Sequence, residues 1–157
     1  AMDMFSDCYE SHRDFLVRYR TDLSYKPEHG NKFADGISFI RWDFYYVHPG
    51  MEQQMEENAN KWKALYTKHN IEAGYRVFTG DIGTDMPMLV VVQLANNDVE
   101  YFTTRERQRD TFGTEGTNLW NETLSIVRKY ESKTGVTRPD LSYMPSGFVF
   151  TNDSGNE

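Results

Sequence analysis

The sequence contains only one cysteine, Cys8, among its 157 residues. A single cysteine cannot form a disulfide within the chain, and it cannot supply the several thiolates of a metal cluster. Long apolar runs are also missing, because no stretch approaches the roughly 20 residues that cross a membrane as a helix. The sequence therefore predicts neither a disulfide-stabilised scaffold nor a membrane partner.

Positive charge is scarce as well. Lysine and arginine together number 17 against 24 aspartate and glutamate residues, which gives a net charge of −7. The nearest approach to a basic stretch, residues 105–110 (RERQRD), alternates in sign and is typical of a solvent-exposed helix face. No segment is suited to following a phosphate backbone, so nucleic acid is not expected as a partner.

Aromatic residues, in contrast, are abundant: the chain has ten tyrosines, ten phenylalanines and three tryptophans. Its hydrophobic content of 38% and charged content of 26% are those of a folded, soluble protein rather than a disordered one. The length corresponds to one ordinary domain with a proper core. We therefore expect a core or a cavity walled by aromatic rings.

A six-residue segment occurs twice. Residues 22–27 (DLSYKP) return 118 positions later as residues 140–145 (DLSYMP), and Arg20 matches Arg138. The chain thus looks like the end of one unit followed by a complete second unit, with boundaries at 1–36, 37–147 and a tail at 148–157. By analogy with the second copy, Leu23 and Tyr25 are expected in a last strand that follows a helix over residues 5–20. That first segment then either docks on the second unit's sheet as an extra strand or serves a partner chain by exchange.

Apolar spacing and turn residues predict the remaining elements. Strands are expected at 37–47, 73–79, 87–94 and 136–144, and helices at 51–69, at 97–109 with Asn97 or Asp98 as its cap, and at 119–130. This order is the ferredoxin-like βαββαβ arrangement of the α+β class, an antiparallel sheet with helices on one face only. Its open face needs a cover, which a homodimer or a tandem copy would supply by pairing sheet to sheet.

The junction at residues 46–51 (YVHPGM), together with this element order, resembles the dimeric α/β-barrel superfamily, which includes antibiotic-biosynthesis-monooxygenase-like domains. The resemblance covers residues 37–145. It implies a barrel with a cavity between sheet and helices or inside the barrel. It also implies activities that range from cofactor-free oxygenation of aromatic substrates, through haem degradation and isomerisation, to none known, so the fold alone selects no reaction.

Alternation along the first strand of this unit separates two faces. Ile40, Trp42, Phe44 and Tyr46 share the face that we expect to pack under the helices. The opposite face carries Phe39, Arg41, Asp43, Tyr45 and Val47. Arginine and aspartate two residues apart would form a buried charge pair that needs a partner or a ligand. They form either the polar end of an aromatic cavity that binds an acid or a phenol, or an ion pair at a dimer interface.

Two further residues complete the predicted site. Gln93 is a polar residue in an apolar strand and, with Tyr45, is expected to form a hydrogen-bonding wall for a ligand. His48 follows the first strand at its mouth, where it could act as a general base, although a plain turn histidine explains it too. No two histidines have metal-ligand spacing, so we predict neither a metal site nor another cofactor.

These residues lead to two hypotheses for function. In the first, the domain binds a small aromatic or acidic molecule in the pocket, as a cofactor-independent oxygenase or isomerase. In the second, it is a non-catalytic structural or oligomerisation module without a ligand, and the polar residues only join two sheets.

Overall fold

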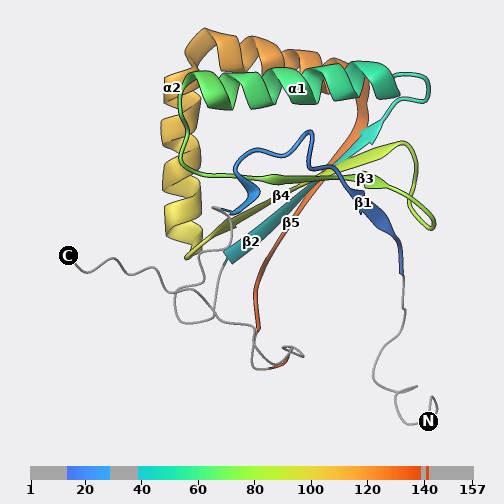
Figure 1. The fold of residues 1–157 in the computed structure, drawn as a ribbon, viewed down its shortest axis with the longest axis horizontal. Coiled ribbons are helices and arrows are strands. Elements are labelled where there is room, and N and C mark those ends of the chain that lie inside the picture. Colours follow the sequence, from blue (N-terminus) through green and yellow to red (C-terminus); the bar gives the residue numbers. More distant parts are fainter. Residues whose placement is uncertain (1–13, 29–38, 139–140, 142–157) are drawn as a thin grey trace.

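The computed structural model describes residues 14–28, 39–138 and 141. One antiparallel sheet carries two helices on the same face (Figure 1). In chain order the elements are β1 (Val17–Tyr19), β2 (Phe39–Val47), α1 (Glu52–Lys68), β3 (Arg76–Gly80), β4 (Met88–Ala95), α2 (Asp98–Ile126) and β5 (Val127–Val136). The strands lie in the order β1-β3-β4-β2-β5, and every pair of neighbours is antiparallel. From β2 onward this is the predicted ferredoxin-like α+β arrangement.

The two helices follow from local signals in the sequence. α1 has a buried stripe that includes Met55, Ala59 and Leu65, at helical spacing, and it packs this stripe on the sheet. α2 begins at the predicted cap, where the Asn97 side chain accepts a hydrogen bond of 2.8 Å from the backbone N–H of Glu100. Neither helix of the described ranges has the length and apolar character that a membrane crossing requires.

A bend divides α2 into two arms. Gly113 has φ 52° and ψ −134°, a backbone conformation that residues with a side chain avoid, and the helical conformation is interrupted there. The part before the bend rises steeply beside the sheet, whereas the part after it runs next to α1 (Figure 1). The bend therefore opens a corner between the two arms and α1.

The end of the domain differs from the prediction. The helix ends at Ile126, and residues 127–136 form β5 along the whole of β2. The last strand therefore begins nine residues before the strand predicted at 136–144. Leu124, Val127 and Tyr130 have helical spacing, but pairing with β2 places Tyr130 opposite Tyr45 and decides the conformation. Of the residues after Val136, the structure describes 137, 138 and 141, and none of them is in a strand.

The prediction of an N-terminal helix was also wrong over the described residues. Val17–Tyr19 is an edge strand that pairs with β3, not the end of a helix, and residues 5–13 lie outside the described part of the chain. The apolar residues of a supposed helical stripe, Leu16 and Tyr19, remain 61% and 41% exposed. Pairing with β3 fixes this segment, and the first of the two predicted outcomes, docking on the sheet as an extra strand, is the one observed.

The two faces of β2 are the reverse of the prediction. Tyr45 and Val47 belong to the core under the helices, whereas Phe44 packs with Met88 and Val90 on the opposite side of the sheet. Both faces are rich in apolar atoms, so alternation separates them but does not tell which one meets the helices. As a result Arg41, Asp43 and Tyr45 share the face that α1 and α2 cover.

Candidate functional site

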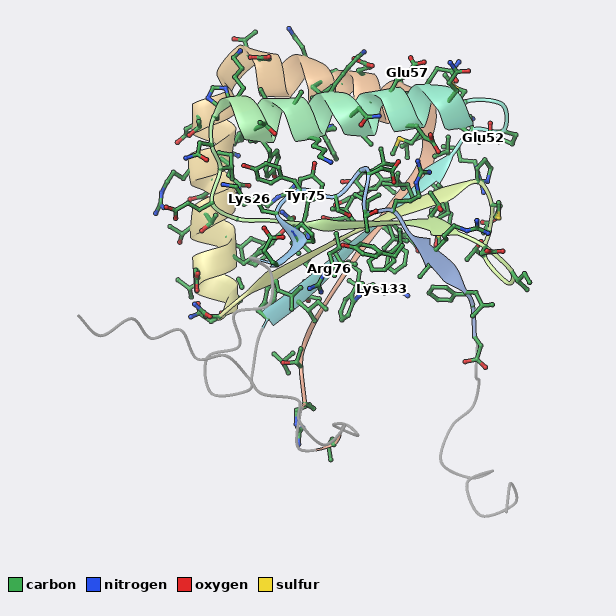
Figure 2. All side chains as sticks on the ribbon, in the orientation of Figure 1. Lys26, Glu52, Glu57, Tyr75, Arg76 and Lys133 are labelled. Atoms are coloured by element: carbon green, nitrogen blue, oxygen red, sulfur yellow. The ribbon has the colours of Figure 1, made fainter. Side chains whose placement is uncertain are left out.

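A cavity lies between the sheet and the two helices. Its volume is about 100 Å³, and its walls come from β2, β3, β4 and both helices. Three of the predicted residues line it: Asp43, Tyr45 and Gln93. Aromatic side chains form much of the remaining wall, and Figure 2 shows Tyr75 among the side chains that fill the space between the layers. The cavity with aromatic walls and polar groups that the sequence predicts thus corresponds to this space between the sheet and the helices.

Asp43 is held in place by two donors. Arg41 Nε donates to Asp43 Oδ1 at 2.9 Å, and the Tyr130 hydroxyl donates to the same oxygen at 2.6 Å. The Asp43 side chain is 2% exposed and the Arg41 side chain 14%, so this ion pair is shielded from water. Arg41 also donates to the Tyr130 hydroxyl at 3.1 Å, which closes a triangle of three polar groups. The triangle compensates the charge of a buried carboxylate.

Arg105 of α2 brings a second guanidinium to the cavity. Its hydrogen-bond partners among the described residues are neutral: the Gln93 side-chain oxygen and the Tyr101 hydroxyl, both at 3.5 Å. No carboxylate of the described residues forms an ion pair with it. Burial lowers the pKa of Arg105, but the surrounding Tyr101, Asp43, Tyr45 and Tyr66 groups outweigh burial and hold that pKa above its ordinary value. The group is therefore a partly buried, charged donor with spare capacity for hydrogen bonds.

The tyrosines of the cavity keep their protons. Burial raises the pKa of Tyr66 to about 12 and raises the pKa values of Tyr45 and Tyr75 in the same direction. The Tyr75 hydroxyl is fully buried, and no described residue forms a hydrogen bond with it or with the Tyr45 hydroxyl. At neutral pH both hydroxyls are donors, and a buried polar group without a partner is a costly feature that a ligand could relieve.

A larger pocket adjoins the inner cavity at the bend of α2. Its volume is about 450 Å³, within the range of small-molecule sites, and it opens at the corner formed by Gly113. Both spaces share the same four residues as walls: Trp62, Tyr66, Arg105 and Trp120. Arg105 thus stands at the boundary between an outer space lined by rings and an inner polar space.

Two of the predicted residues lie elsewhere. Arg41 contacts Asp43 and the face of the Tyr101 ring, 5.7 Å from its centroid, but does not line the cavity. His48 is an exposed residue of the turn after β2, where its backbone bonds to Ile126 and Met51. It is absent from the cavity wall, so its role as a base stays a prediction that the geometry does not support.

Sequence reasoning missed the residues contributed by the helices. Arg105 lies in the RERQRD stretch that reads as a solvent-exposed helix face, because charge alternation hides the one arginine that turns inward. Trp62 and Tyr66 lie in the helix predicted at 51–69, where their apolar spacing predicts only packing against the core. The signal that could have found Arg105 is its spacing of four from Tyr101, which places both on the buried side of α2. Among the described residues, no group of three His, Cys, Asp or Glu side chains could hold a metal ion.

Solved structures of other proteins have a similar fold. No family model and no curated protein matches the chain. A crystal structure of a NIPSNAP family protein from Agrobacterium tumefaciens matches with a TM-score of 0.55 at 12% identity, over 67% of this chain and 89% of that one. The chain shares its fold. A second protein from Agrobacterium tumefaciens matches with a TM-score of 0.50 at 14% identity, over 64% of this chain and 92% of that one.

At these identities the similarity extends to the fold alone. It confirms the ferredoxin-like arrangement of the sheet and helices that the sequence predicts. Membership of the antibiotic-biosynthesis-monooxygenase-like group stays a prediction, and the residues of the site have to be interpreted from their own chemistry.

Proposed function

We propose that this domain binds a small, planar organic acid between its sheet and its helices. The acid group lies against Arg105 and the ring lies in the outer pocket, among Trp62, Phe112 and Trp120. One observation carries the proposal: Arg105 is a partly buried guanidinium at the junction of two cavities, and among the described residues it has no carboxylate partner. A bound carboxylate would supply the missing pair with the bidentate geometry that guanidinium favours.

The charges around the inner cavity support an anionic ligand. Arg41 and Arg105 carry two positive charges against the single negative charge of Asp43, so this group retains one positive charge. The two hydroxyls without a described partner, those of Tyr45 and Tyr75, are donors and suit the oxygen atoms of an acid. A neutral or cationic molecule would leave the Arg105 charge unmatched.

Replacing Arg105 by glutamine should weaken the binding of an aromatic acid about 10- to 100-fold, because a hydrogen bond to a charged group contributes roughly 1.5–3 kcal/mol. The test titrates the protein with benzoate, salicylate and 1-naphthoate, and with the neutral benzamide, by isothermal calorimetry and by NMR line broadening. We expect the acids to bind the original chain and benzamide to bind it weakly.

Arg107→Gln is the matched control, since Arg107 lies two residues away on the exposed side of the same helix. It should leave the affinity for the acids unchanged. Equal binding of benzoate and benzamide, or equal losses in the two variants, would contradict the proposal. Absence of binding across the whole panel would favour the alternative of a module without a ligand.

A catalytic role would require a base beside the bound molecule. Cofactor-independent oxygenation or isomerisation of an aromatic substrate begins with removal of a proton. Asp43 is the one carboxylate in the wall of the inner cavity, and no hydrogen bond from another described residue reaches its Oδ2 oxygen. Asp43 therefore replaces His48 as the candidate base, and binding without turnover remains the simpler proposal.

We also propose that two copies pair through the sheet face opposite the helices. Phe44, Val90 and Val92 form a buried apolar cluster there, and the partly buried Ile40 and Trp42 extend it to the surface; none of the described helices covers it. Two such faces can pack as in a sheet sandwich. Trp42→Glu should convert a dimer to a monomer in multi-angle light scattering at micromolar concentration. Val99→Glu, at an exposed position of α2, should leave the mass unchanged, and a monomeric original chain would contradict the pairing.

A further inference from the structure

The inner cavity beside Arg105 has room for more than an acid group. A space of roughly 10–15 Å³ holds one water-sized group, and this cavity has a volume of about 100 Å³. A carboxylate contributes only two oxygen atoms, and in the function proposed above the ring of the ligand lies in the outer pocket. A further small group of the ligand therefore fits inside the inner cavity, and the side chains around it select its chemistry.

Two polar atoms of β2 in the cavity wall have no hydrogen bond from the described residues, and they differ in kind. The Tyr45 hydroxyl keeps its proton, because burial and the charge of Asp43 raise its pKa. The Asp43 carboxylate uses one oxygen, Oδ1, for both of its described donors, Arg41 and Tyr130. Its second oxygen, Oδ2, is a charged acceptor without a described donor. The cavity wall thus offers a phenol that donates and a carboxylate that only accepts.

The hydroxyl and the carboxylate lie close enough for one atom to join them. Asp43 and Tyr45 are two residues apart on the same face of β2, which separates their backbones by roughly 6–7 Å. The Tyr45 ring packs 5.1 Å from the ring of Tyr130, whose hydroxyl binds Asp43. An oxygen with one hydrogen bond on each side, of about 2.7–2.8 Å, spans up to roughly 5.5 Å. Arg105 is also near, since its charge acts on the Tyr45 pKa.

A group that joins these two residues has to accept one hydrogen bond and donate another. A hydroxyl does both, accepting from Tyr45 and donating to Asp43. A carbonyl accepts from Tyr45 but turns a second acceptor toward Asp43. An ammonium adds a positive charge beside Arg41 and Arg105, whose charges Asp43 and the ligand's carboxylate already balance. A methylene leaves both protein groups without a partner.

We propose that the ligand is an aromatic 2-hydroxy acid, of the type of mandelate, and that Tyr45 and Asp43 recognise its hydroxyl group. This inference rests on the function proposed above, in which the carboxylate lies against Arg105 and the planar ring lies in the outer pocket. The carboxylate, the hydroxyl and the ring then occupy three fixed places around one carbon atom. The site therefore distinguishes the two enantiomers of such an acid.

The test compares four acids that share one skeleton: (R)-mandelate, (S)-mandelate, phenylacetate with a methylene in place of the hydroxyl-bearing carbon, and benzoylformate with a carbonyl. Isothermal calorimetry measures the affinity of each for the full chain. One enantiomer of mandelate should bind at least tenfold more tightly than the other enantiomer, phenylacetate and benzoylformate, because only that enantiomer forms a hydrogen bond with the charged Asp43 and with Tyr45 together.

Tyr45→Phe removes only the hydroxyl. It should lower the affinity for the preferred mandelate at least fivefold, reduce the difference between the enantiomers, and leave phenylacetate binding unchanged. Tyr46→Phe is the matched control, since the next residue of β2 points to the opposite face of the sheet, where its hydroxyl donates to Glu131 at 3.1 Å. This control should bind all four acids as the original chain does.

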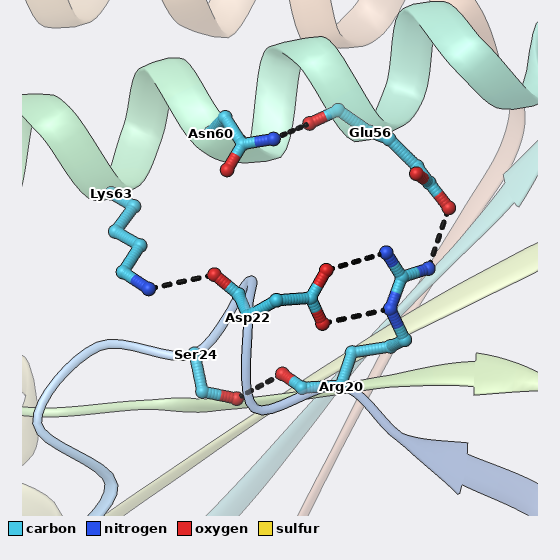
Figure 3. A network of polar contacts seen from close by, with 6 residues as sticks. All are labelled: Arg20, Asp22, Ser24, Glu56, Asn60 and Lys63. Atoms are coloured by element: carbon cyan, nitrogen blue, oxygen red, sulfur yellow. Dashed lines mark hydrogen bonds and ion pairs between the residues drawn. The ribbon is translucent and has the colours of Figure 1, made fainter.

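A second control separates recognition of the hydroxyl from the packing of α1, which contributes Trp62 and Tyr66 to the cavity wall. Arg20 binds the Asp22 carboxylate at 2.9 and 2.7 Å and also binds Glu56 of α1, as Figure 3 shows. Arg20→Ala removes these contacts away from the cavity. The preference for one mandelate enantiomer should persist in this variant, and its loss there would overturn the role of Tyr45.

The ligand series on the original chain decides the inference even if a variant proves to be unfolded by circular dichroism. Equal affinities for phenylacetate and both mandelates, all weakened by Arg105→Gln, would overturn the hydroxy-acid inference and support the acid site. Tighter binding of benzoylformate than of mandelate would also overturn it. Absence of binding by all four acids, and by the acids of the first panel, would contradict the acid site itself.

Discussion

Replacing Asp43 by alanine should lower the free energy of unfolding by about 3–5 kcal/mol, the usual cost of removing one partner from a buried ion pair. The substitution leaves the Arg41 guanidinium, 14% exposed, without its carboxylate, and it leaves the Tyr130 hydroxyl without its acceptor at 2.6 Å. Asp43→Asn should cost less, because an amide oxygen can still accept from Tyr130. The loss is measured by urea unfolding followed by fluorescence and circular dichroism.

Glu115→Ala provides the matched control. Glu115 lies 2.6 Å from Lys68, close to the 2.9 Å between Asp43 and Arg41. The side chains of Glu115 and Lys68, however, are 54% and 60% exposed. Exposed pairs contribute between about 0 and 1 kcal/mol, so this variant should unfold at almost the urea concentration of the original chain. A loss at Asp43 no larger than the loss at Glu115 would show that water reaches the Arg41–Asp43 pair in solution.

Replacing Leu23 by alanine should cost about 2–5 kcal/mol, as expected for a large-to-small change in a packed core. Leu23 is 1% exposed and shares its cluster with Tyr25, Tyr66 and Val77. Leu141→Ala is the control that the chain itself supplies, because the same residue in the same motif is 75% exposed. That substitution should change the free energy of unfolding by less than about 0.5 kcal/mol.

Urea unfolding of both leucine variants measures this difference. Hydrogen exchange adds a local readout, since loosening of residues 17–27 should speed exchange at the backbone N–H groups of Tyr75 and Val77, which bind this segment. Equal losses for Leu23 and Leu141 would contradict the difference in burial between the two leucines. An unchanged stability in both variants would mean that the segment around Leu23 contributes little to the core.

Local patterns were sufficient for the elements from residue 39 to the middle of α2. The aromatic and β-branched run of β2, the apolar stripe of α1 and the Asn97 cap each act within a few residues, so the sequence predicts them directly. The failures lie where a distant partner decides the conformation. Val127 and Tyr130 have apolar spacing compatible with a helix, but pairing with β2 makes Val127–Val136 a strand. Val17–Tyr19 likewise becomes a strand because the edge of β3 is available.

The candidate site shows the same division. Alternation along β2 places Arg41, Asp43 and Tyr45 on one face, and Gln93 stands out as a polar residue in an apolar strand. Packing alone determines that this face lies under the helices, that Arg41 turns to Asp43 instead of the cavity, and that His48 stays outside. Arg105 enters the site because α2 passes over the sheet before bending at Gly113, which no local pattern predicts.

By itself, the sequence determined the fold class, the order of strands and helices over most of the domain, and the repetition of the DLSY segment. These features depend on periodicity and on residue identity, which are properties of the chain alone. Only the tertiary structure decided which face of the sheet meets the helices, where the cavity lies, and that one leucine of the repeated motif is buried while the other is exposed. The physical reason is that burial and pairing depend on segments far apart in the chain, so identical residues acquire different surroundings when different segments pack against them.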